Sequence, residues 1–368
     1  MKNAIILICL LLLLIGCRSI TGDVVKEEQI VIGVSSPETG FGARFGEYVR
    51  NGMELALERL PEEERNNIKI VYEDDQCNSV EGFNIARKLV AFDNAKFVIG
   101  PFCAAVVIPT TDFYEENKVI RLVTGLGNEG LRDIGNHTFV FLGDTKSLMT
   151  ALAEHAYEKG DRKVSVLYLQ DDYGQENINH FKRIFQELGG AVIAEESFNP
   201  KSVMDYRTQL KKLQSKNPDS IFLIAIGGSL VSSLQQIDEL GIETNIYGIR
   251  NTEDPEIIKS AGKLIEGVSF PSITVEPITN EGKWYLEQYL VKYGEPHEVV
   301  SANAYDSFNV LYNAIKECNQ NVECVKLKIN KIKDYEGVSG TFSIDSDGFA
   351  IRQPVIKTVK NGEFVIVS

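Results

Sequence analysis

The sequence predicts an α/β protein of two lobes, each of which is a doubly wound parallel sheet. Its 368 residues, 43% hydrophobic and 24% charged, are enough for two globular domains of about 150 residues each. Short β-branched runs alternate with stretches of helical periodicity, and this alternation is typical of parallel sheets. The alternation falls into two series that meet near residue 144, so we expect two sheets.

The first strand–loop–helix unit, residues 30–60, contains the clearest change of period. A β-branched run at 30–34 is followed by a loop at 35–42 that is rich in Ser, Pro, Thr and Gly, and then by Val49 and Met53 at helical spacing. Open α/β sheets bind ligands at the carboxyl ends of their strands, so this loop is a candidate binding segment. An ordinary βα connection would show the same pattern.

The remaining elements follow in order. In the first series we expect strands at 68–73, 97–99 and 119–123 and helices at 80–91 and 104–116. In the second series we expect helices at 145–159, 175–188, 203–214 and 229–240 and strands at 164–169, 191–198, 220–226 and 246–249. The last third of the chain predicts helices near 284–291, 302–317 and 322–332 and a hairpin-like tail.

These last elements are too few to form a third domain. We therefore assign them to the two lobes and expect the chain to cross between the lobes more than once. The expected first lobe comprises residues 30–143 and 272–335, and the expected second lobe comprises residues 144–271 and 336–368.

The amino terminus has the pattern of an export signal. A lysine near the start is followed by an apolar run at 4–15, then by Gly16 and Cys17, and this run is shorter than the about twenty residues that cross a membrane. The sequence Leu-Ile-Gly-Cys that ends at Cys17 resembles the lipobox of exported lipoproteins. We expect residues 1–16 to be a signal peptide and residues 17–29 to be a lipidated, flexible tether. A plain signal peptide is the alternative.

The formal net charge of −14, with no basic tract, argues against nucleic acid or an anionic membrane surface as a partner. An acidic chain of this kind suits a soluble protein outside the cell.

The cysteine count is consistent with export. Apart from Cys9 in the signal and Cys17, four cysteines remain, namely Cys77, Cys103, Cys318 and Cys324. In an oxidising compartment they can pair in sequence order, although the sequence alone allows three connectivities. A zinc site is disfavoured, because there is no Cys-x-x-Cys and the four histidines have no paired ligand spacing. No metal or cofactor is expected.

Five motifs occur in the order seen in the type I periplasmic binding proteins. Besides the opening unit they are Asp-Asp-Gln-Cys at 74–77, Ile-Gly-Pro-Phe-Cys at 99–103, Asp-Asp-Tyr-Gly at 171–174 and Ala-Tyr-Asp at 304–306. The chain resembles the leucine/isoleucine/valine-binding branch, which serves ABC importers. The resemblance implies a monomer of two lobes joined by three hinge strands, a small solute bound in the cleft, and a membrane permease as partner. It also implies a disulfide between Cys77 and Cys103.

The resemblance implies a set of ligand-binding positions, and several of them depart from the family pattern. They are Phe45, Ala104, Ala105, Leu126, Gly127, Asn128, Tyr173, Gly227 and Arg250. Ala104 stands where a serine hydroxyl usually holds the ligand carboxylate, and Asn128 lies nearest to a usual threonine. Phe45 and Tyr173 correspond to aromatic residues that contact the ligand, or else they pack between the lobes.

Arg250 is the largest departure, because the amino-acid binders place there a glutamate that pairs with the ligand ammonium. A guanidinium suits a carboxylate and repels an ammonium, so the cleft is expected to prefer an anionic or neutral polar ligand. A surface position for Arg250 is the alternative. Gly227, at a strand end before a helix, offers backbone donors that also favour an anion, or forms a plain tight turn.

The sequence gives little support for an enzymatic function. There is no Gly-x-Ser-x-Gly elbow, His-Glu-x-x-His, Walker-type loop or dinucleotide fingerprint. The adjacent aspartates at 74–75 and 171–172 are expected to solvate loop ends or cap helices. The stronger alternative to an importer component is a ligand sensor that signals to a separate membrane receptor.

Overall fold

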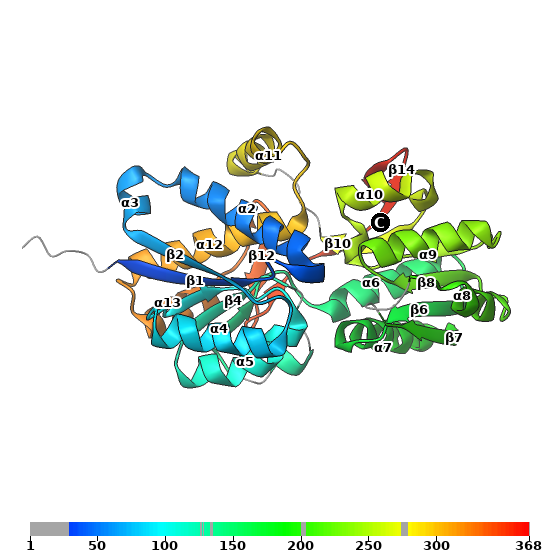
Figure 1. Ribbon diagram of the computed structural model, residues 1–368, viewed down its shortest axis with the longest axis horizontal. Helices are drawn as coiled ribbons and strands as arrows, with labels where there is room; N and C mark the ends of the chain where they lie inside the picture. The colour runs from blue at the N-terminus through cyan, green and yellow to red at the C-terminus, as the bar shows by residue number, and fades with distance from the viewer. Residues whose placement is uncertain are drawn as a thin grey trace, which may run out of the picture.

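The computed structural model describes residues 29–125, 127, 129–132, 135–199, 204–273 and 279–367. They form two α/β lobes that lie side by side (Figure 1). The first lobe contains a parallel sheet in the order β2-β1-β3-β4-β5, and the second contains a sheet in the order β15-β14-β10-β9-β8-β6-β7. The signal peptide, Cys17 and the tether expected up to residue 28 lie outside the described residues.

The first half of the first lobe alternates strands and helices. Its elements are β1 (Ile30–Ser36), η1 (Gly40–Gly42), α2 (Ala43–Arg59), α3 (Glu62–Asn66), β2 (Ile68–Asp74), α4 (Ser79–Ala91), β3 (Phe97–Ile99), α5 (Ala104–Glu116), β4 (Ile120–Val123), η2 (Glu129–Leu131) and β5 (Thr138–Val140). Because every pairing within this sheet is parallel, both of its faces need a helical layer. Side chains from α4 and α5 cover one face around Val98.

The opposite face of this sheet is covered by helices from distant parts of the chain. Helix α12 (Val299–Glu317) packs along α2 and is buried over most of its length. The two helices approach so closely that a Cβ added at Gly52 would lie 2.0 Å from the carbonyl oxygen of Ser301. Helices α11 (Asn280–Tyr293) and α13 (Val322–Asn330) belong to the same lobe (Figure 1). The first lobe is therefore complete only when residues from the last third of the chain are in place.

The second lobe shows the same alternation, but its sheet is mixed and not wholly parallel as expected, because β14 pairs antiparallel with both β10 and β15. Its elements are α6 (Thr145–Glu158), β6 (Lys163–Leu169), α7 (Asp172–Glu187), β7 (Ala191–Phe198), α8 (Arg207–Gln214), β8 (Ser220–Ile224), α9 (Gly228–Glu239), β9 (Asn245–Tyr247), η3 (Arg250–Thr252), α10 (Pro255–Ala261), η4 (Gly262–Ile265), β10 (Ser269–Ile273), β14 (Pro354–Lys360) and β15 (Glu363–Ile366). In β6, Val164 and Val166 point to the α6–α7 side, whereas Leu167 and Leu169 point to the α8–α9 side. This division places apolar residues on both faces of a buried strand.

The third sheet changes one expected boundary. It contains β11 (Tyr335–Gly337), β12 (Gly340–Ile344) and β13 (Ala350–Ile351). The expected second lobe included residues 336–368, but Val140 of the first sheet forms a bridge with Phe349, and the rings of Phe141 and Phe342 are 5.4 Å apart. These contacts place the strands against the first lobe, so we draw the last crossing between Ile351 and Pro354.

The chain passes between the lobes after β5, after β10 and before β14, and two arginines bind the first and last of these crossings together. Arg352 donates from Nε to the carbonyl oxygen of Phe141 at 2.9 Å and from Nη1 to that of Ser339 at 2.8 Å. Arg132 pairs with Asp144, which caps α6, at 2.7 Å, and with Asp345 and Asp347 at 3.1 and 2.9 Å. These bonds hold the first and last crossings together at the edge of the first lobe.

Both disulfides expected from sequence order are present. Cys77–Cys103 joins the loop after β2 to the start of α5, and Cys318–Cys324 closes the turn between α12 and α13. Within the described ranges, no helix is both long enough and apolar enough to span a membrane, and no group of three or more potential metal ligands is found.

Candidate ligand-binding site

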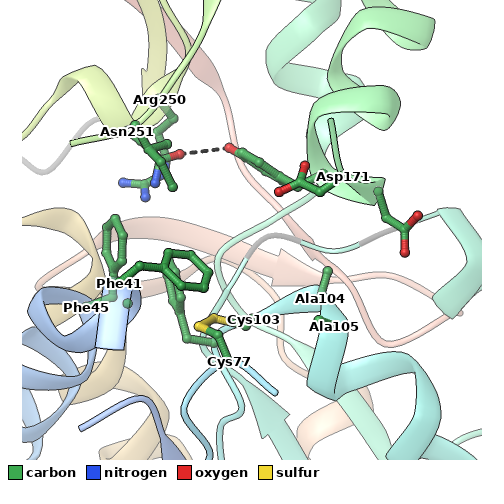
Figure 2. A pocket seen from close by; sticks show the side chains of 14 residues that line it. Phe41, Phe45, Cys77, Cys103, Ala104, Ala105, Asp171, Arg250 and Asn251 are labelled. Carbon is green, nitrogen blue, oxygen red and sulfur yellow. Dashed lines mark hydrogen bonds between the residues drawn. A yellow bond between two sulfur atoms is a disulfide. The ribbon is translucent and has the colours of Figure 1, made fainter. Parts of the chain in front are cut away.

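A pocket lies between the two lobes, at the carboxyl ends of strands from both sheets (Figure 2). Its cavity volume is about 170 Å³. It is lined by Phe41, Gly42, Phe45, Cys77, Phe102, Cys103, Ala104 and Ala105 from the first lobe and by Asp171, Asp172, Tyr173, Ile226, Arg250 and Asn251 from the second. These residues follow β1, β2, β3, β6, β8 and β9, which is where open α/β sheets bind ligands.

The first-lobe wall is largely apolar. Phe45 and Phe102 are stacked with ring centroids 4.5 Å apart, beside the Cys77–Cys103 disulfide. Phe41 sits in the turn η1 with 67% of its surface exposed, so it forms the mouth of the pocket and not its floor. Stacked rings of this kind offer a broad face to the apolar part of a ligand.

The amino terminus of α5 supplies polar groups to this apolar wall. No side chain caps this helix, because its N-cap residue is the disulfide-bonded Cys103. The first helical N–H groups, those of Ala104 and Ala105, have no acceptor within the helix, and both residues line the pocket. Two amides at a helix start, aligned with the positive end of the helix dipole, suit a carboxylate oxygen.

The second-lobe wall is polar and is held by a buried ion pair. Arg250 is 1% exposed, and its Nη1 donates to Oε1 of Glu298 at 2.6 Å. Burial acts to lower the pKa of Arg250, but the attraction of Glu298 outweighs it and the pKa is raised, so the guanidinium stays charged. Glu298 also caps α12, because its Oε2 accepts the N–H of Val300 at 2.6 Å. The pair therefore joins the second lobe to the first.

Tyr173 and Asn251 complete this wall. The hydroxyl of Tyr173 donates to Oδ1 of Asn251 at 2.7 Å, a bond that Figure 2 shows as a dashed line. Burial raises the pKa of Tyr173 to about 12, so the phenol is neutral at ordinary pH. Because Oδ1 of Asn251 is engaged, its amide nitrogen is the group that remains for a ligand.

Two aspartates lie at the exposed rim of the pocket. Asp171 caps α7, because its Oδ1 accepts the N–H of Gly174 at 2.8 Å, and Asp172 is the first residue of that helix. The sequence predicts that this helix begins at residue 175. The cap explains why it begins at Asp172 instead. It also places Tyr173 in the first helical turn and directs the ring to the pocket.

The structure brings together five of the nine positions implied by the resemblance: Phe45, Ala104, Ala105, Tyr173 and Arg250 line the pocket. Leu126 and Asn128 lie outside the described residues. Gly227 caps α9 with a φ of 51° and neighbours the lining residue Ile226, but it does not line the pocket itself.

Gly127 is not a lining residue, contrary to the expectation. Its N–H donates to the carbonyl oxygen of Gly143 at 2.8 Å, and a Cβ at this position would lie 2.2 Å from the ring of Phe349. Its backbone therefore anchors the first crossing between the lobes.

Other lining residues were not anticipated from the sequence. Phe41, Gly42 and Phe102 lie within segments that the motifs identified, and Asn251 follows Arg250 directly. No local sequence pattern indicated a role for Glu298, because it pairs with a residue 48 positions away. The sequence predicts a free cationic side chain at Arg250, and the structure instead gives a guanidinium partly neutralised by Glu298.

Comparison with known proteins assigns the fold. A family model described as periplasmic binding protein matches residues 29–363. The chain belongs to this family. It is similar to the Leu/Ile/Val-binding protein homolog 2 of Brucella abortus, with 26% identity over 334 residues that cover 89% of each chain.

Solved structures in the family agree. The structure is similar to a leucine-binding protein from Thermotoga maritima, with a TM-score of 0.85, 27% identity and coverage of 92% and 98% of the two chains. A branched-chain amino-acid binding protein from Streptococcus pneumoniae, solved with isoleucine, has the same fold, with a TM-score of 0.82, 24% identity and coverage of 92% and 99%. The predicted type I fold of two lobes is confirmed. The chain is a solute-binding protein and not an enzyme.

Proposed function

We propose that this protein captures a small organic carboxylate between its lobes outside the cytoplasm and delivers it to an ABC importer. The observation that carries the proposal is the interlobe pocket, in which the uncapped start of α5 adjoins the stacked rings of Phe45 and Phe102. Such a wall suits a carboxylate joined to an apolar body. The names of the relatives support the same chemistry, because leucine, isoleucine and valine are carboxylates with apolar side chains.

The mechanism is closure of the lobes on the ligand. A ligand that touches α5 on one side and Arg250 or Asn251 on the other gains contacts only when the lobes approach. Its binding therefore shifts the population toward the closed form, with the three crossings between the lobes as the hinge. The closed form is the one that a permease would recognise.

Binding without chemical change tests the proposal. We expect native mass spectrometry to show one small molecule per protein and the released compound to be intact after hours of incubation. Co-purification with a membrane permease would support delivery to an importer. Steady conversion of the bound compound, or a protein that holds no small molecule under any condition, would contradict the proposed function.

Lipid attachment at Cys17 is a separate prediction. Two disulfides support an oxidising compartment, and the lipobox-like sequence before Cys17 supports acylation there. We expect Cys17→Ser to yield an unacylated protein in the soluble fraction, whereas the unmodified sequence partitions with membranes. Intact-mass measurement of both forms gives the lipid mass directly. Equal membrane association of the two would exclude anchoring through this residue.

A further inference from the structure

We propose that the ligand carries no α-ammonium group and presents, besides its carboxylate, a second oxygen acceptor to Arg250 and Asn251. This inference rests on the proposed function and specifies the substrate class of the same site. Suitable ligands are short 2-oxo acids with an apolar body.

Apart from the two aspartates at the rim, the polar groups at both ends of the pocket are hydrogen-bond donors. At the first lobe these are the N–H groups of Ala104 and Ala105. At the second they are the guanidinium of Arg250 and the amide nitrogen of Asn251, whose oxygen already accepts from Tyr173. Figure 2 shows Arg250 and Asn251 on the side of the pocket opposite Phe41, Phe45 and the disulfide. A ligand that spans the cleft must therefore offer acceptors at both ends.

The guanidinium of Arg250 has a donor that the described part of the protein leaves unsatisfied. Glu298 engages only Nη1 of Arg250, and Nε of Arg250 is buried with no hydrogen-bond partner among the described residues. A buried donor without an acceptor is costly, and an acceptor oxygen near this group relieves the cost. Glu298 does not line the pocket, so it holds the guanidinium from behind without occupying the ligand's place. We assign Glu298 as a positioning residue.

An ammonium group would have only exposed carboxylates to pair with among the described lining residues. Among the described lining residues, the carboxylates are Asp171 and Asp172, and both lie at the exposed rim. One oxygen of Asp171 is already used in capping α7. An ammonium in the pocket would therefore find only these exposed carboxylates as partners, while the buried charge of Arg250 opposes it.

Matched ligands separate the effect of charge from that of shape. The probes are leucine, 4-methyl-2-oxopentanoate and 4-methylpentanoate, which share one carbon skeleton, together with phenylalanine, phenylpyruvate and 3-phenylpropanoate. In calorimetry we expect the oxo acid of a set to bind roughly ten- to a hundredfold more tightly than the amino acid, with the unsubstituted acid between them. An amino acid that binds as tightly as its oxo counterpart, or failure of all six to bind, would overturn the inference.

A double variant tests the assigned residues. Arg250→Gln combined with Glu298→Gln removes the guanidinium without leaving a buried charge, and we expect the preference for the oxo acid to fall about tenfold or more. Arg121→Gln is the matched control, because Arg121 is an equally buried arginine that bonds Thr110 and Thr111 away from the pocket. The control should keep the preference, whatever its stability. An unchanged preference in the double variant would refute the role of Arg250.

The proposed function and this inference fail in different ways. Tight binding of leucine with an intact ligand on release would refute the inference and leave solute capture standing. Absence of any bound small molecule, in native mass spectrometry and in calorimetry, would refute both.

Discussion

Glu298→Gln is expected to lower the free energy of unfolding by about 3 to 5 kcal/mol, because it leaves the guanidinium of Arg250 buried without its ion-pair partner. The two side chains are 1% and 2% exposed, so bulk water solvates the remaining charge poorly. Glutamine keeps an oxygen that can accept the N–H of Val300, so the cap of α12 is retained and the charge is the main change. Urea unfolding followed by fluorescence of Trp284, the single tryptophan, measures the loss.

An exposed ion pair provides the matched control. Arg207 and Glu239 lie 2.6 Å apart, the same separation as in the buried pair, but are 46% and 53% exposed. Glu239→Gln is therefore expected to cost far less than Glu298→Gln. The double variant Arg250→Gln/Glu298→Gln should recover much of the stability lost in Glu298→Gln. Equal losses at the two pairs, or additive losses in the double variant, would show that the buried charge is not the cause.

The stability of the protein should depend on pH through Asp306. This carboxylate of α12 is buried, where it accepts the N–H groups of Val338 and Ser339 at 2.9 and 2.7 Å, and burial raises its pKa from 3.8 to about 6. Between these values the native state binds a proton that the unfolded state has released. The stabilising contribution is thus present below about pH 4 and is lost as pH rises through 6, a change of about 3 kcal/mol.

Asp306→Asn cannot titrate at this position and therefore isolates the effect. We expect the stability of the unmodified protein, relative to the variant, to fall by about 3 kcal/mol between pH 4 and pH 7. Carboxylates whose pKa is lowered, such as Asp74 and Glu323, act in the opposite direction but are common to both proteins and cancel in the comparison. Urea unfolding of both proteins at intervals across this range gives the two curves. Parallel curves would contradict the prediction.

Most of the fold was predictable because periodicity reports local burial. β3, α5 and β7 have the bounds that the sequence predicts, since each is an apolar or amphipathic run between turn residues. β10, by contrast, contains Pro271 and two serines, a composition that does not predict a strand. It is a strand because it pairs with β14, which comes much later in the chain. The strands of the third sheet are two to five residues long, too short for a periodic signal.

The site was predictable where its residues belong to local motifs. Phe45, Ala104 and Tyr173 each follow a strand end closely, so a motif that marks the strand also locates the side chain. The environment of Arg250 depends on Glu298, which reaches it through the packing of α12, and no local pattern encodes that contact. The place of Gly127 likewise depends on a residue far along the chain, because the ring of Phe349 packs where a Cβ of Gly127 would be.

The three crossings between the lobes also constrain the order in which the molecule can fold. Helix α2 lies near the start of the chain, but its buried partner α12 begins at Val299, so more than two hundred further residues must reach the folding compartment before the two can pack. During that interval the apolar face of α2 is available to any other hydrophobic surface. Neither lobe can be completed before the other is largely synthesised, so the two must be protected together and not one after the other.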